Sequence, residues 1–140
     1  MTGLHTNTSL AVEWGKWLAN YFFMHGQNNP FLLTIKFGWR VVLEHDDEAS
    51  ALMPARLAEW DGSRRMIRLF IPGLHRHLGN STQVLSRACA HELFHGLAAV
   101  NYRVLRLQEF LRLPAIAIPK LNFREEEIAA QVFSEAWLNS

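Results

Sequence analysis

The segment His91-Glu92-Leu93-Phe94-His95 constrains what this chain can fold into more than any other part of the sequence. Histidines four residues apart lie on the same face of an α-helix, one turn from each other. Two imidazoles in that arrangement can hold one Zn²⁺, and the glutamate that follows the first histidine can act as a general base on a metal-bound water. The segment therefore predicts a helix with a metal site on one face.

The residues around this motif are those of a helix. One face of this helix is formed by side chains that are three or four residues apart: Val84, Ala88, His91 and His95. Asn80 or Ser81 can cap the N-terminus, and we expect the helix to run to about Val100. Gly96 lies inside this helix at a cost of about 1 kcal/mol relative to alanine. Its missing side chain leaves room for a close neighbour or a substrate.

The size and composition of the chain indicate one globular domain over residues 1–140. A chain of 140 residues, 49% of them hydrophobic, can bury a single core and is too apolar to be disordered. The net charge of +1 provides no general attraction for nucleic acid or an anionic membrane, so we expect no direct nucleic-acid partner. Local basic clusters remain, for example Arg64, Arg65 and Arg68.

Cysteine usage and the N-terminal residues indicate the compartment. Cys89 is the single cysteine, which excludes an intrachain disulfide and favours a reducing environment. The N-terminal residues lack the basic start of a signal peptide, and no run of about 18 uncharged apolar residues occurs. We therefore expect a soluble, cytoplasmic protein with no membrane partner, and we expect Cys89 to be a small core residue.

Hydrophobic periodicity and turn residues predict the other elements. We expect a helix over residues 8–25, strands over 32–37, 39–43, 52–60 and 65–71, and helices over 103–112 and 123–138 after the motif helix. Asp61-Gly62 is a strong hairpin signal, and Pro72-Gly73 ends the last strand before a loop or short helical turn over 74–79. The order predicts an α+β fold: an N-terminal helix, a small antiparallel sheet of three to four strands, the motif helix and C-terminal helices.

A catalytic zinc site needs a third protein ligand. No third histidine follows closely, and the downstream candidates are acidic: Glu109, Glu125, Glu126 and Glu127. Acidic residues at a helix start also favour the helix dipole, and with Asn122 as N-cap, Glu125 completes a capping box. Glu127 lines up with small and polar residues that allow two helices to approach closely. We therefore favour Glu127 as the third ligand, with Glu126 as the alternative.

These motifs together resemble those of the gluzincins, zinc metallopeptidases in which HExxH is joined by a downstream glutamate. Within them the chain is similar to the ImmA/IrrE-type family, which has Glu-x-x-Ala-Asn-x-Phe-Ala on a second helix. Residues 127–134 match this pattern with Gln for Asn and Ser for Ala, and residues 39–43 and 66–71 are similar to the family's upstream segments. The resemblance covers roughly residues 35–138. It implies a zincin-like fold and a zinc-dependent peptidase.

On this interpretation the chain is a zinc metalloendopeptidase that acts on a protein or peptide. We expect Zn²⁺ on His91, His95 and Glu127, with Glu92 taking a proton from water and delivering it to the leaving amine. The strand over residues 65–71 would align the substrate as an added strand at its edge. An oxyanion donor is also needed, and the candidates by residue type are Tyr102, His75 and His77. The simpler interpretation is that Tyr102 is a buried aromatic residue and that His75 and His77 are exposed loop residues.

Two other interpretations stay open. The first is a catalytically inactive zinc-binding domain that serves as a protein-interaction module, and the second is a metal-free helical scaffold. Glu92 favours the enzyme, because a purely structural zinc site needs no base and is closed by four ligands, often cysteines. Aromatic residues of the N-terminal helix are expected in the core: Trp14, Trp17 and Phe22. If exposed, they would mark a partner or homodimer surface.

Overall fold

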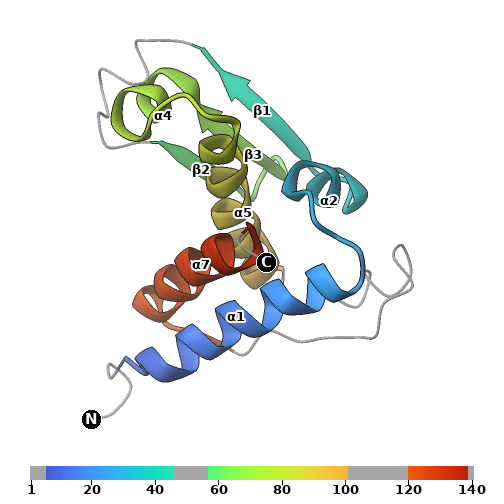
Figure 1. The fold of residues 1–140 in the computed structure, drawn as a ribbon, viewed down its shortest axis with the longest axis vertical. Coiled ribbons are helices and arrows are strands. Elements are labelled where there is room, and N and C mark those ends of the chain that lie inside the picture. The colour runs from blue at the N-terminus through green and yellow to red at the C-terminus, as the bar shows by residue number, and fades with distance from the viewer. Residues whose placement is uncertain (1–5, 46–56, 101–119, 139–140) are drawn as a thin grey trace.

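The computed structural model describes residues 6–45, 57–100 and 120–138, which form an α+β fold (Figure 1). The described helices are α1 (Thr8–Met24), α2 (Pro30–Lys36), α4 (Ile71–Leu78), α5 (Thr82–Ala99) and α7 (Phe123–Leu138). The described strands are β1 (Arg40–Glu44), β2 (Ala58–Asp61) and β3 (Met66–Phe70). The sheet and α4 lie at one end of α5, whereas α1 and α7 lie side by side at its other end. The helices predicted over residues 8–25, 81–100 and 123–138 are confirmed; the helix predicted over 103–112 lies outside the described residues.

The three-stranded sheet is mixed, with β3 between β1 and β2. β2 and β3 are antiparallel, as the turn signal after β2 predicts, and the Asp61 carboxylate closes the turn by accepting N–H bonds from Ser63 and Arg64. β1 runs parallel to β3, so the prediction of an antiparallel sheet is wrong. The reason is that β1 pairs with β3 and not with β2, which is its next strand in sequence. The strand predicted over residues 52–60 is described only in part. Its last residues belong to β2, and residues 52–56 lie outside the described residues.

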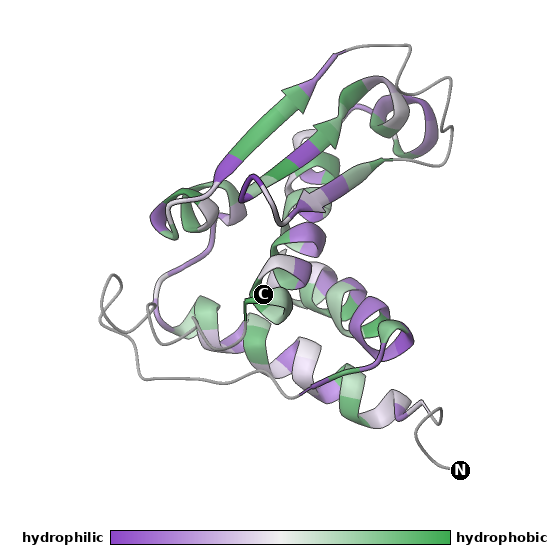
Figure 2. Cartoon of the chain, turned by 180° about the vertical axis from the view of Figure 1, so that it is seen from behind, coloured by the Kyte–Doolittle hydropathy of each residue, from purple (hydrophilic) through white to green (hydrophobic). Residues whose placement is uncertain are grey.

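Arg68 of β3 connects all three strands. Its guanidinium donates to Glu44 of β1 at 3.1 Å and to Glu59 of β2 at 2.8 Å. In Figure 2 the middle of β1 is hydrophobic between hydrophilic ends, which correspond to Arg40 and Glu44. Two carboxylates neutralise Arg68, so this member of the possible basic patch of Arg64, Arg65 and Arg68 is not a free cation.

The segment over residues 32–37 is helical, so the strand predicted there is wrong. The Asn29 side chain accepts hydrogen bonds from the N–H groups of Phe31 and Leu32, and Pro30 occupies the first turn, where its fixed φ suits a helix. Leu33 and Thr34 are buried at helical spacing from Pro30. Local capping and burial of one helix face thus override the β propensity of this apolar run. The segment after β3 is likewise helical: Ile71, expected in the strand, begins α4.

The helices α1 and α7 approach so closely that a side chain would not fit at Gly15. A Cβ there would lie 2.6 Å from the backbone oxygen of Ala129 and 2.9 Å from the Cβ of Val132. Aromatic rings fill the adjoining core, where Phe22 of α1 packs against Phe133 of α7. The absence of a side chain at Gly15 lets the two helix backbones meet.

The aromatic residues of α1 do not share one environment. Phe22 is buried as predicted, Trp14 is half-buried, and Trp17 is 46% exposed, which differs from the core position expected for it. Trp17 lies against Tyr21, their ring centroids 5.4 Å apart. No helix in the described part of the chain has both the length and the apolar content that a bilayer crossing requires.

Glu125 joins the N-termini of two helices. Its Oε1 accepts the backbone N–H of Asn122 while the Asn122 side chain accepts the N–H of Glu125, so the predicted capping box is confirmed. Its Oε2 accepts the backbone N–H of Asn7, the N-cap residue of α1, at 2.7 Å. The buried carboxylate therefore fixes where α7 begins and where α1 lies beside it.

We expect Gly15→Ala to lower the free energy of unfolding by about 1–3 kcal/mol, because the added methyl meets helix backbone that cannot move aside. Helix propensity alone would change it by about 1 kcal/mol in the opposite direction. Urea unfolding followed by circular dichroism measures the difference. Lys16→Ala, at the exposed neighbouring position, is the control and should stay within about 0.5 kcal/mol of wild type. A Gly15→Ala protein of undiminished stability would contradict the close packing.

We expect Glu125→Ala to lower the free energy of unfolding by about 2 kcal/mol, since donors at two helix N-termini lose a buried acceptor. Glu135→Ala on the exposed side of the same helix should change it by less than about 0.5 kcal/mol. Both are measured by chemical denaturation. Equal effects of the two substitutions would show that Glu125 does not join α1 to α7.

Candidate metal centre

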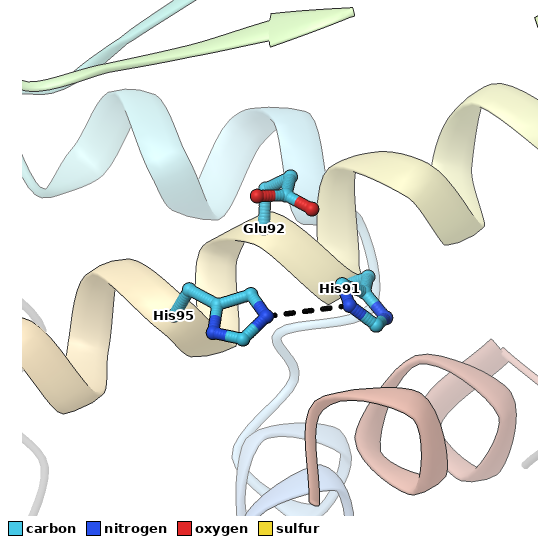
Figure 3. Close-up of side chains that lie close together, drawn as sticks. All are labelled: His91, Glu92 and His95. Atoms are coloured by element: carbon cyan, nitrogen blue, oxygen red, sulfur yellow. Dashed lines mark hydrogen bonds between the residues drawn. The ribbon is translucent and has the colours of Figure 1, made fainter. Parts of the chain in front are cut away.

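The helix α5 carries the three residues of the HExxH motif. The Ser81 side chain caps it by accepting the N–H of Val84, as predicted. The rings of His91 and His95 point toward each other on one side of α5, whereas the Glu92 carboxylate leaves the helix on another side (Figure 3). The two Nε2 atoms are 3.3 Å apart. One ligand atom from each of the three residues lies within 4.8 Å of the other two.

The N-terminal part of α7 adds two carboxylates to this group. Glu127 Oε1 lies 2.7 Å from His95 Nε2, and its Oε2 lies 3.5 Å from His91 Nε2. Glu126 Oε2 lies 2.5 Å from the opposite ring nitrogen of His95, Nδ1. Glu127 therefore faces the nitrogens that the two histidines direct at each other, while Glu126 holds the outer side of one ring.

Two of the three separations between these donor atoms match those around a tetrahedral Zn²⁺. Ligand atoms about 2.1 Å from a tetrahedral ion are about 3.4 Å from one another. The separation of the two Nε2 atoms is 3.3 Å, and that between His91 Nε2 and Glu127 is 3.5 Å. The shorter contact between His95 and Glu127 is a direct hydrogen bond or ion pair. Two imidazoles and one carboxylate are also the donor set of many catalytic zinc sites.

Glu126 occupies the position of an outer carboxylate. Metal-binding histidines commonly donate their other ring N–H to a carboxylate, which fixes the ring orientation and directs the free nitrogen at the metal. The contact between Glu126 and His95 Nδ1 has this geometry. A neutral His95 ring that carries its proton on Nδ1 has the lone pair on Nε2. The structure thus places the two glutamates at different atoms of the same ring.

Burial and neighbouring charges alter the proton affinities of the motif. Burial raises the pKa of Glu92 to about 7; His95 and the backbone N–H of Trp60 oppose this rise, while the charges of Glu127 and Glu59 add to it. Burial and the charge of His95 lower the pKa of His91. Glu92 is therefore a carboxylate whose proton affinity suits exchange near neutral pH.

The pKa of His95 shifts in the opposite direction to that of His91. Burial lowers the pKa of His95, but the hydrogen bond with Glu126 and the charges of Glu92 and Glu127 outweigh that effect and raise it. These groups form a compact cluster of mutual contacts.

A cleft of about 570 Å³ leads to His91 and is bounded by β2, α4, α5 and α7. Its lining includes Glu92, Glu127 and His91 together with residues that sequence reasoning did not assign to a site: Ala58, Leu74, Leu78, Arg87 and Glu135. Helical spacing could have predicted that Arg87 lies beside the motif, because it precedes His91 by one helical turn. The others come from elements whose placement depends on the tertiary fold.

The remaining candidates lie away from the motif or outside the described residues. His75 and His77 are exposed on α4, not in a loop, and neither lines the cleft. Tyr102 and Glu109 lie outside the described residues. Cys89 is buried as predicted, within 3.9 Å of the Thr34 hydroxyl, and burial raises the pKa of its thiol to about 12.

The strand expected to align a substrate is not at an edge. β3, which covers most of residues 65–71, is paired on both sides, so the prediction of an edge there is wrong. Among the described strands, β2 lies at an edge of the sheet and borders the cleft. Gly96 leaves room for the rings of Trp39 and Trp60, whose nearest atoms would lie 3.1 Å from a Cβ at that position. The missing side chain thus admits two neighbours that hold β2 against α5.

Comparison of the chain with protein-family models, with curated proteins and with solved structures finds no match.

Proposed function

We propose that the protein is a zinc-dependent metallopeptidase that hydrolyses a peptide bond of a protein or peptide. In this proposal His91, His95 and Glu127 hold Zn²⁺, and Glu92 is the general base. The observation that carries it is the convergence of both Nε2 atoms on the Glu127 carboxylate, with Glu92 close by but directed elsewhere. Membership of the gluzincins, a zincin-like fold and the similarity to the ImmA/IrrE-type family belong to the same proposal.

The chemistry divides between the ion and the chain. Zn²⁺, when bound, supplies a Lewis acid that lowers the pKa of water and polarises a carbonyl group. Glu92 accepts the proton of the attacking water and then delivers it to the leaving amine. Glu126 keeps the His95 ring oriented through Nδ1. The cleft beside β2 admits an extended peptide.

An inactive zinc-binding interaction module would use the same ligands. Glu92 supports catalysis over that alternative, because its carboxylate lines the cleft and leaves α5 on another side than the two histidine rings. A structural zinc site is closed by four protein ligands. In this proposal the two histidines and Glu127 supply three, and the cleft reaches His91 and Glu127.

The third ligand is tested by comparing Glu127→Ala with Glu126→Ala. We expect purified wild type to hold close to one Zn²⁺ and Glu127→Ala to lose it, because one of three protein donors is removed. Glu126→Ala should keep the metal with an affinity about 10–100-fold lower, since an orienting partner is lost. Metal content by mass spectrometry and competition with a chelator measure both. Arg124→Ala, at an exposed position of α7 outside the cleft lining, is the control. Release of zinc by the Glu126 change alone would make the assignment wrong.

The general base is tested by Glu92→Gln, which is nearly isosteric. We expect it to retain zinc and to lose peptide cleavage by a factor of about 100 or more, because the amide cannot accept the proton. Cleavage of a broad peptide library by zinc-loaded protein, read by mass spectrometry, supplies the rates. If wild type holds zinc yet cleaves nothing, the interaction module replaces the enzyme. If wild type holds no zinc, both proposals fail.

A further inference from the structure

The cleft extends along α5 beyond the histidines, toward the N-terminal half of that helix. Val84, Arg87 and Ala88 line it together with His91. Arg87 precedes His91 by four residues, so the two side chains leave the helix on the same face. At a rise of about 1.5 Å per residue, the two positions are about 6 Å apart along the helix axis. Arg87 is thus one turn from the candidate metal centre and in the same cleft.

Arg87 is the only lysine or arginine among the described residues that line this cleft. No described carboxylate forms an ion pair with it, in contrast to Arg68, which two carboxylates hold. The neighbouring wall is apolar and includes Leu74 and Leu78, the latter 57% exposed. An exposed guanidinium beside an apolar wall offers a planar set of N–H donors to whatever fills the cleft.

Three described carboxylates also line the cleft. Glu92 and Glu127 belong to the candidate metal centre, and Glu135 on the α7 wall accepts a hydrogen bond from Gln131. An occupant that runs along α5 therefore passes from the carboxylates around the histidines to a single cation one turn away. The charge that complements this end of the cleft is negative.

We propose that Arg87 binds a carboxylate of the substrate, about two residues from the bond that is cleaved. The proposal rests on the proposed peptidase function and adds a substrate class to it: peptides with an Asp or Glu side chain, or a free C-terminal carboxylate, at that distance. An extended peptide advances about 3.3 Å per residue, so two residues span the separation of His91 from Arg87. Guanidinium and carboxylate match as a bidentate pair, and such a charge-assisted contact changes affinity about tenfold or more.

The experiment uses octapeptides of alanine and leucine with a fluorescein label. In one series Asp is scanned through the positions of C-terminally amidated peptides, in a second Asn replaces Asp, and in a third the Asn peptides end in a free carboxylate. Cleavage by zinc-loaded wild type, Arg87→Gln and Arg87→Glu is followed by mass spectrometry. Binding of the same peptides to zinc-loaded Glu92→Gln, with and without each Arg87 change, is followed by fluorescence anisotropy. Arg124→Gln, on the exposed start of α7, is the matched control.

We expect Asp at one position, or the free C-terminus, to raise binding and kcat/KM about tenfold over the amidated Asn series. Arg87→Gln should abolish that preference, Arg87→Glu should reverse it so that the Asn peptides bind better than the Asp peptides, and Arg124→Gln should leave it unchanged. The Asp series and the free-carboxylate series distinguish the two sources of the charge.

Equal binding of the three series by wild type, a preference that survives Arg87→Gln, or no peptide binding at all would overturn the proposal. The anisotropy measurement does not require catalysis. A protein that binds the acidic peptides through Arg87 but cleaves none would refute the peptidase function and leave the carboxylate site intact. A protein that cleaves peptides with no acidic preference would do the reverse.

Discussion

The carboxylate of Glu125 is the contact on which the geometry of the candidate metal centre depends. It accepts hydrogen bonds from the starts of both α1 and α7, so it fixes the residue at which α7 begins and the side of α1 on which it lies. Successive residues of a helix turn by about 100°. Because Glu125 caps the helix, Glu126 and Glu127 leave α7 in different directions. They contact opposite ring nitrogens of His95. Three consecutive glutamates thus have three different contacts.

The close approach of helices makes this arrangement possible. Gly15 lets α1 lie on the backbone of α7, and a layer of aromatic rings from α1, α5 and α7 fills the space beside that contact. On α5, Gly96 has a similar effect toward the sheet, because Trp39 and Trp60 pack where a side chain would be. The motif helix is therefore held from two sides, by α7 and by β2. Its histidines face the first neighbour, and its glutamate is close to the second.

The cluster of imidazoles and carboxylates is costly to bury without a compensating cation. Burial alone raises the proton affinity of Glu92 and lowers that of His91, since each shift disfavours a charge in the protein interior. Shared protons between His95 and the α7 carboxylates offset part of this cost in the metal-free protein. In the proposed function, a divalent ion at the same place would balance the charges more fully. Arg87, one turn away and unpaired among the described residues, lies outside that balance.

The local sequence determined the features that depend on neighbours along the chain. The motif spacing, the caps at Ser81 and Asn122, the Asp61-Gly62 turn and the capping role of Glu125 are all short-range, and the structure has each of them. Only the tertiary structure decided what depends on elements meeting across the fold. In the tertiary structure β1 is parallel to β3, and the apolar run predicted as a strand is the helix α2. Among the described strands, β2 and not β3 lies at the sheet edge beside the cleft. The tertiary structure also gave Glu126 and Glu127 their separate ring nitrogens: sequence spacing places both near the start of a helix, but which atom each one meets depends on how α7 packs against α5.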